Sequence, residues 1–263
     1  YSFHPFMRTR LVQKKFSEDL GGWREIHERL EAYFSSLLPK TAIDESAFWA
    51  DKNQQRNARE QIYHQLCSSG PKHLPEALNT FLNLLEFDPF LAAGWARTIR
   101  QAGTDTLNRG LYNWGQRILL GLLGLYQKSY TAANAMFTAL SQYPGLEAGQ
   151  AAVITRWSAE VHRYLHHYTE SLELLDKSIA NDSEDPILYA LRGEVNRIRG
   201  DYEEAVNDFK HALQIKPDCA FSLSRRGEIY REMTLYEDAI KDLNQALELI
   251  PDAAGLLVLR ADL

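Results

Sequence analysis

The feature that most constrains this chain is a segment that occurs twice, 34 residues apart. Residues 199–218 read RGDYEEAVNDFKHALQIKPD, and a closely similar segment ends at Asp252. Seven positions return at the same offset: Tyr202, Ala205, Asp208, Ala212, Leu213, Pro217 and Asp218 become Tyr236, Ala239, Asp242, Ala246, Leu247, Pro251 and Asp252. A fixed period of this length is typical of helical-repeat proteins, in which each repeat stacks on the next one.

Apolar residues within the repeated unit recur every three or four positions, which predicts helices and not strands. Leu188, Leu191 and Val195 line a first helix that ends before Gly200. A second helix carries Ala205 and Phe209 on its apolar face, and Pro217 ends it. One such pair has too little apolar surface to be stable alone, so we expect the pairs to stack.

These residues resemble the tetratricopeptide repeat (TPR), a helix–turn–helix unit of 34 residues. The positions that the family pattern specifies are filled by Gly193, Tyr202, Ala205, Phe209, Ala212 and Pro217, and again by Gly227, Tyr236, Ala239, Leu243, Ala246 and Pro251. The resemblance implies an all-α fold, in which antiparallel helix pairs form a right-handed superhelical solenoid. Small residues would lie where the two helices of a pair approach closely.

The pattern weakens toward the N-terminus. Residues 152–263 are expected to hold TPR repeats, the last one truncated, because Ala254–Leu263 begins a first helix without a second. Residues 57–151 are expected to form degenerate repeats, since Tyr130, Ala133, Phe137 and Pro144 match after a few inserted residues. We therefore expect the natural protein to continue beyond Leu263.

Residues 1–56 do not follow the repeat and are expected to form a helical junction. They resemble the segment of bacterial STAND NTPases that leads from a winged-helix region into helical repeats. The residues that carry this resemblance are His4, Pro5, Arg8, Trp23, His27 and Tyr33, with Tyr63 and His64 at the start of the array. The nucleotide-binding core is missing, because no GxxxxGK[ST] phosphate loop occurs in the chain. The resemblance implies the sensor arm of a signalling ATPase, in which ligand binding promotes oligomerisation and, in some members, the ligand is a phage protein.

Composition and charge limit the classes of partner that the chain is expected to bind. The net charge of −6 argues against nucleic-acid binding, and no apolar run reaches the 18 residues of a membrane span. The two cysteines, Cys67 and Cys219, have no metal-ligand spacing and indicate buried thiols in a reducing compartment. We expect a cytoplasmic fragment that is monomeric by itself and binds a protein or peptide.

Three patterns invite a chemical interpretation, and each is better explained by packing. His162 and His166 are four residues apart, as in a zinc pair, but no third ligand has a fixed spacing to them. Trp95 and Trp114 flank a basic segment that could contact nucleic acid, although the surrounding repeats are acidic. The glycines of residues 121–130 have no cationic anchor and indicate close helix packing. We predict no catalytic residue, metal or cofactor.

A charged ladder recurs with the array. Glu160, Glu194 and Glu228 are 34 residues apart, and Arg163, Arg197 and Arg231 each follow three residues later. By resemblance to the family, these six side chains and Arg156 face the groove in which ligands lie. Two roles remain open, namely a ladder that sets the repeat register and a mixed-charge ligand surface. The carboxylate clamp of chaperone-binding relatives is not expected, because a row of Glu side chains would repel a peptide carboxylate.

The preferred function is therefore protein or peptide binding, without catalysis in this fragment. A general TPR scaffold or co-chaperone-like adaptor is the alternative. A third possibility is an enzyme within residues 1–150, where the repeat pattern is weakest.

Overall fold

The computed structural model of the chain describes residues 5–39 and 44–263, and His4 lies outside them. The described residues form helices and contain no strand, which confirms the expected all-α class. The chain divides into two compact units, Tyr1–Ile154 and Thr155–Leu263, here called unit 1 and unit 2. Helix α9 (Ala148–Tyr164) contains the boundary between them.

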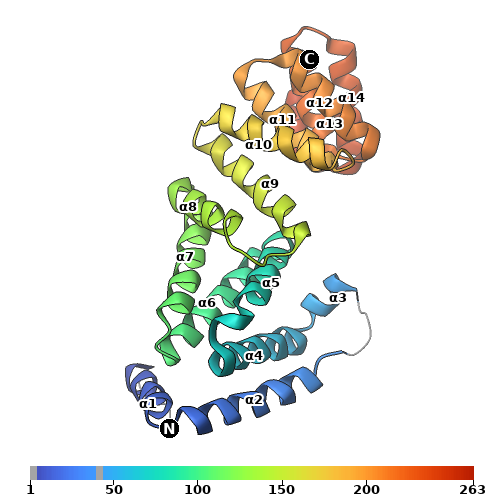
Figure 1. Ribbon diagram of the computed structural model, residues 1–263. Coiled ribbons are helices and arrows are strands. Elements are labelled where there is room, and N and C mark those ends of the chain that lie inside the picture. The colour runs from blue at the N-terminus through green and yellow to red at the C-terminus, as the bar shows by residue number, and fades with distance from the viewer. Residues whose placement is uncertain (1–4, 40–43) are drawn as a thin grey trace. The chain divides into compact units, whose positions relative to one another are not determined.

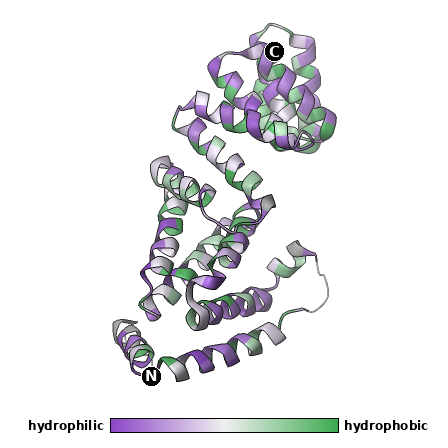
Figure 2. Cartoon of the chain, in the orientation of Figure 1, coloured by the Kyte–Doolittle hydropathy of each residue, from purple (hydrophilic) through white to green (hydrophobic). Residues whose placement is uncertain are grey.

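Unit 2 consists of helix pairs in chain order (Figure 1). After α9 come α10 (Tyr168–Asn181), α11 (Pro186–Arg199), α12 (Tyr202–Ile215), α13 (Ala220–Glu232), α14 (Tyr236–Leu249) and α15 (Ala254–Ala261). Each helix from α10 onward packs on the next one, and α11 also contacts α13. The first helices of successive repeats therefore lie next to one another, as stacking requires. Hydrophilic and hydrophobic residues are interspersed along these helices (Figure 2), which is the pattern of amphipathic helices that bury one face.

The same backbone motif closes the first helix of three successive repeats. His166, Gly200 and Thr234 have φ angles of 61°, 87° and 62°, and they are 34 residues apart. In each case the next backbone N–H bonds back to a carbonyl five residues earlier, at 2.8–2.9 Å, which is the helix-closing bond of a Schellman motif. Glycine occupies this position only in the middle repeat, so His166 and Thr234 adopt a conformation that their side chains disfavour.

Packing inside unit 2 follows the repeated apolar positions. Phe209 is fully buried in one cluster together with Ala205, Ala212 and Ile229 of the following helix. A Cβ at Gly193 would lie 3.2 Å from the Phe209 ring, and one at Gly227 would lie 3.1 Å from Leu243. The small residues of the repeat thus stand where the two helices of a pair approach closely, as the family pattern implies.

Unit 1 is built around α6. Its helices are α1 (Pro5–Glu18), α2 (Leu20–Ser36), α3 (Glu45–Ala50), α4 (Lys52–Ser69), the 3-10 helix η1 (Gly70–His73), α5 (Leu74–Phe87), α6 (Pro89–Asp105), α7 (Arg109–Tyr126) and α8 (Tyr130–Ser141). Helix α6 packs on α4, α5 and α7, while α2 packs on α4. Glycines permit this packing, since a Cβ at Gly115 would lie 2.4 Å from the backbone N of Arg100. Gly121 and Gly124 approach α8 in the same way, which confirms close helix packing there.

Several residues that carry the N-terminal resemblance meet in one buried cluster of unit 1. The ring centroids of Trp23 and His27 are 4.3 Å apart, and His27 Nδ1 lies 2.7 Å from His64 Nδ1. The Trp23 indole N–H donates to the Cys67 carbonyl at 3.1 Å. Burial lowers the pKa of both His27 and His64 to about 4, so each ring is neutral at pH 7 and one can donate to the other. Tyr33, in contrast, is 56% exposed.

Neither cysteine forms a disulfide with a described residue; Cys67 is buried and Cys219 is half-buried. None of the helices in the described ranges combines the length and the apolar character that crossing a membrane requires.

Candidate ligand-binding groove

The charged ladder lies on the first helices of three successive repeats in unit 2. Helix α9 carries Glu160 and Arg163, α11 carries Glu194 and Arg197, and α13 carries Glu228 and Arg231. The spacing of three residues places each Glu and the following Arg on one face of their helix. The ladder residues therefore project from equivalent positions of the repeat.

Two of the three Glu–Arg pairs form as the spacing predicts. The Arg163 guanidinium donates to both carboxylate oxygens of Glu160, at 2.9 and 2.5 Å. Arg197 donates to both oxygens of Glu194, at 2.8 and 2.9 Å. The hydrogen bonds that Arg197 donates to Glu194 raise the pKa of its guanidinium, against the opposing effect of burial. These forked bonds fix both side chains, which is more than an exposed ion pair on a helix surface achieves.

The third pair does not form. Glu228 accepts instead from Arg225 Nη1, at 2.8 and 3.0 Å, and Arg231 bonds to the adjacent Glu232 at 2.7 Å. The physical reason is competition within α13, because Arg225 lies three residues before Glu228 and also reaches the carboxylate of Glu194 on α11. An arginine three residues before or three residues after a glutamate can pair with it, and Glu228 pairs with Arg225, the one that comes before it.

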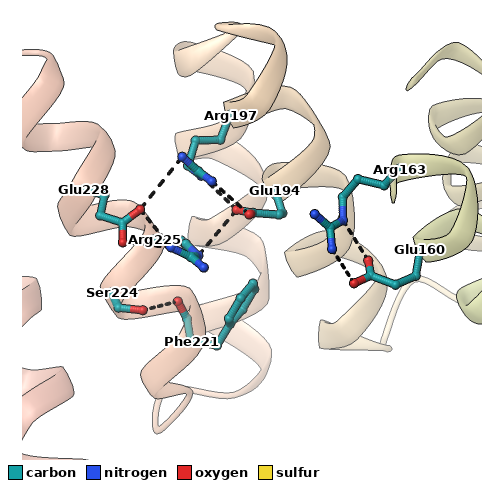
Figure 3. A network of polar contacts seen from close by, with 8 residues as sticks. All are labelled: Glu160, Arg163, Glu194, Arg197, Phe221, Ser224, Arg225 and Glu228. Carbon is teal, nitrogen blue, oxygen red and sulfur yellow. Dashed lines mark hydrogen bonds and ion pairs between the residues drawn. The ribbon is translucent and has the colours of Figure 1, made fainter. Parts of the chain in front are cut away.

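Together these contacts form a closed ring of four charges between neighbouring repeats (Figure 3). Arg225 Nε lies 3.6 Å from Glu194, and Arg197 Nη1 lies 3.9 Å from Glu228. The ring thus consists of Glu194 and Arg197 from α11 with Arg225 and Glu228 from α13. Its central carboxylate, Glu194, is only 6% exposed. Contacts of this kind couple the first helices of these two neighbouring repeats, α11 and α13.

Arg156 stands apart from the ladder. Its Nη1 donates to Asp185 Oδ2 at 3.1 Å, and Asp185 also caps the start of α11 by accepting from the Ile187 backbone N–H. Arg156 therefore holds the beginning of the next repeat.

The ring changes the electrostatic argument against a carboxylate clamp. The sequence suggested a row of repelling carboxylates, but Glu160, Glu194 and Glu228 each lie against an arginine. Opposite charges at these distances cancel most of the field that an approaching ligand would feel. Repulsion by bare carboxylates is therefore not a sound reason for excluding a peptide terminus.

A pocket of about 230 Å³ opens beside the ring. Its lining comes from α11, α12, α13 and α15 and includes the ladder residues Arg197, Glu228 and Arg231. The other lining residues are Tyr202, Ile229, Glu232 and Leu259. Both charge signs, a phenol and two aliphatic side chains are thus brought to one concave surface. This arrangement can bind a ligand by hydrogen bonds and apolar contact together.

A second set of repeated ion pairs was not foreseen from the sequence. Arg192 donates to Asp208 with bonds of 2.7 to 3.2 Å, and Arg226 donates to Asp242 with two bonds of 2.7 Å. Each aspartate lies sixteen residues after its arginine, on the second helix of the same repeat. Arg192 also reaches back sixteen residues to Asp176, and Arg260 reaches back by the same step to Asn244. The signal was present, because arginine recurs at positions 192, 226 and 260.

The other candidate patterns resolve into packing contacts. Helix α9 ends at Tyr164, so His166 lies in the following turn, off the helical face that carries His162, and bonds to the Tyr168 hydroxyl at 2.7 Å. Trp95 is buried and donates to the Ala77 carbonyl, so its ring is not available for base stacking. In the part of the chain that the structure describes, no group of three or more His, Cys, Asp or Glu side chains could hold a metal ion.

Comparison with known proteins agrees with this architecture. The family model described as tetratricopeptide repeat matches residues 187–219 and 222–252. No curated protein sequence matches the chain.

Two solved structures illustrate the similarity, and the first of them bears on the fold. The APC/C hetero-tetramer Cut9-Hcn1 is similar over 97% of this chain and 55% of that chain, with a TM-score of 0.50 and 18% identity. YrrB, described as a TPR protein with an unusual peptide-binding site, covers 70% of this chain and 90% of its own, with a TM-score of 0.47 and 20% identity. Residues 187–219 and 222–252 are thus two consecutive tetratricopeptide repeats, and the chain has the all-α fold of tetratricopeptide-repeat proteins.

Proposed function

We propose that unit 2 binds a protein or peptide segment in the groove beside the charged ring. The observation that carries this proposal is the pocket of about 230 Å³, in which Arg197, Glu228 and Arg231 meet Tyr202 and Leu259. A peptide backbone offers donors and acceptors at regular intervals, and a surface with both charge signs can pair with both. The aliphatic and aromatic side chains supply the apolar area that binding needs.

Arg231 is the best residue for a test. Among the residues that the structure describes, its ion-pair partner is the exposed Glu232, so its replacement leaves the ring of Glu194, Arg197, Arg225 and Glu228 intact. Glu194 is unsuitable, because it is buried and holds two arginines. Arg231→Glu reverses one charge of the pocket lining with little expected effect on the fold.

The experiment is a selection of peptides that bind the immobilised chain, followed by titration of the enriched peptides. Loss of one charge-assisted contact costs about 1.5–3 kcal/mol, so Arg231→Glu should weaken binding at least about tenfold. The matched control is Glu237→Lys, a charge reversal at an exposed position in the first turn of α14. Unchanged affinity in Arg231→Glu, together with loss in Glu237→Lys, would contradict the proposal and place recognition on the second helices.

The setting of this activity is a finer proposal, that the chain is the sensor arm of a bacterial STAND NTPase with degenerate repeats in residues 57–151. It is supported by the packing of Trp23, His27 and His64 in one cluster, because these residues carry the N-terminal resemblance. Sensing of a phage protein by such an arm, in the cytoplasm, belongs to the same proposal. The test is the coding sequence upstream of Tyr1, which must contain a phosphate loop. Its absence would leave a general TPR scaffold as the function.

A further inference from the structure

A second concave surface lies in unit 1, between α4 and α6, which pack on each other. The facing sides of these two helices enclose a pocket of about 390 Å³. Four residues from each helix line it, at the spacing of a single helical face: Arg56, Arg59, Glu60 and Tyr63 from α4, and Gly94, Arg97, Thr98 and Gln101 from α6. Three of these eight residues are arginines.

The three arginines give the pocket its positive charge. Among the residues that the structure describes, Arg56, Arg59 and Arg97 take part in no ion pair with a carboxylate. Glu60 lies 3.9 Å from His64 Nε2 and contributes the pocket's single acidic side chain. The lining therefore carries a formal charge of about +2 on a chain whose net charge is −6. This contrasts with the ladder of unit 2, in which the Glu residues are paired with arginines.

Two polar residues of the pocket lining, Tyr63 and Gln101, are held in place by hydrogen bonds to the buried Asp105. Asp105 is 2% exposed and accepts from the Tyr63 hydroxyl at 2.7 Å and from Gln101 Nε2 at 2.8 Å. Burial raises the pKa of Tyr63, with smaller contributions from Cys67 and Asp105, so the phenol stays neutral and keeps donating. Tyr63 and Gln101 are thus fixed by a carboxylate that solvent does not reach.

Gly94 lets one arginine lie across the interface between the helices. A Cβ at position 94 would stand 3.3 Å from Arg59 Nη1, which is tighter than ordinary contact. The guanidinium of Arg59 therefore lies close to the α6 backbone at Gly94, while Arg97 stands one turn further along α6. Cationic side chains from both helices consequently face the same space.

We propose that the α4–α6 pocket binds the carboxylate side chains of an acidic protein segment. Arginine is suited to this task, because its planar guanidinium can donate two parallel hydrogen bonds to one carboxylate. Glu60 offers an acceptor for a backbone N–H of the same segment. The site lies outside the groove of unit 2, and the proposal holds whether or not that groove binds a ligand.

Nucleic acid fits this surface less well than an acidic segment. A phosphate backbone is bound along an extended basic stripe, often with aromatic rings on which bases stack. Here the arginines surround one concavity, Glu60 stands among them, and Trp95 of α6 is buried.

The test is the binding of a fluorescently labelled oligo-glutamate peptide to the whole chain, followed by anisotropy at low and high salt. Wild type should bind the peptide, and salt should weaken binding because the contacts are exposed charges. The Arg59→Gln/Arg97→Gln double variant should bind at least about tenfold more weakly. The matched control is Lys72→Gln/Arg109→Gln, which removes the same charge from exposed positions outside the pocket.

Four outcomes would overturn the proposal. The first is that the peptide does not bind to wild type. The second is that wild type and the Arg59→Gln/Arg97→Gln variant bind the peptide equally well. The third is that this variant and the control lose the same amount of affinity. The fourth is tighter binding of oligothymidylate or inorganic phosphate than of oligo-glutamate at the same arginines, which would assign the site to phosphates. Circular dichroism of each variant must match wild type, and Arg59→Lys/Arg97→Lys, which keeps the charge, should retain part of the affinity.

Discussion

The ion pair between Arg226 and Asp242 permits a quantitative test of how the repeats hold together. Asp242 joins the two helices of one repeat through two bonds of 2.7 Å, and its side chain is 4% exposed while that of Arg226 is 17% exposed. Asp242→Ala leaves a largely buried guanidinium without its acceptor. Breaking a buried pair in this way costs about 3–5 kcal/mol, and the partial exposure of Arg226 favours the lower end of that range. We expect a loss of about 3 kcal/mol, roughly a hundredfold in the folding equilibrium.

The second half of the test removes both partners. Arg226→Met/Asp242→Leu replaces the pair by apolar side chains of similar volume, which is often neutral or stabilising by about 1–4 kcal/mol. Urea unfolding followed by circular dichroism measures the single and double variants. If Asp242→Ala loses less than about 1 kcal/mol, or if the double variant is no more stable than Asp242→Ala, then burial does not govern this pair and the reasoning is wrong.

The pKa of Asp208 in the neighbouring repeat independently supports the expected cost of burying an ionised carboxylate. Burial raises the pKa of Asp208 above its usual value, although Arg192 and Asn196 act in the opposite direction. A carboxyl whose pKa is higher in the folded than in the unfolded chain contributes its stability below the unfolded pKa and loses it as pH rises through the folded pKa. The ionised Asp208 is therefore less stable in the fold than in water at neutral pH. The cost comes from burial, and the hydrogen bonds from Arg192 offset part of it because they lower the pKa of Asp208.

Three further predictions concern packing, backbone and pH. Phe209→Ala should destabilise unit 2 by about 3–5 kcal/mol, since this ring is fully buried, and a melting shift no larger than that of the exposed Lys210→Ala would refute the repeat register. Thr234→Gly should stabilise by about 1 kcal/mol because it relieves a φ of 62°, and thermal melts that show no gain would contradict this. The folded pKa values of His27 and His64, about 4, lie below the usual 6.5, so stability should fall as pH drops from 6.5 to 4, by about 3 kcal/mol for one histidine. Melting curves across this range should show the slope, and a His27→Phe/His64→Leu variant should lose most of it.

The period of 34 residues was enough to predict the helix pairs of residues 186–252. It works because helix formation, close packing at Gly193 and the turn at Gly200 are local or nearest-neighbour events. The repeat pattern weakens toward the N-terminus, so the helix packing of unit 1 could not be predicted from it. There α6 packs on α1, α4, α5 and α7, and its glycine contacts with α7 depend on tertiary neighbours that no period reveals.

The candidate site was only partly predictable for a similar reason. The spacing of three residues identified the Glu160–Arg163 and Glu194–Arg197 pairs, since both partners lie on one helix. It did not identify Arg225, because the choice between two arginines near Glu228 depends on the position of Glu194 in the neighbouring repeat. The α4–α6 pocket was missed because α4 and α6 are far apart in sequence and carry no repeated pattern.

The step of sixteen residues between Arg192 and Asp208 has a consequence for how an array of this kind changes in length. Asp242 stands fifty residues after Arg192, and deletion of residues 200–233 would bring it to the sixteen-residue separation that Asp208 holds now. The shortened chain would still present an aspartate to that arginine, and Arg260 would keep Asn244. The loss of this whole unit therefore keeps these sixteen-residue partners matched, whereas a deletion of another length would separate Arg192 from Asp242. Such an array can lengthen or shorten its binding surface by copying or losing a repeat, without evolving new Arg–Asp contacts.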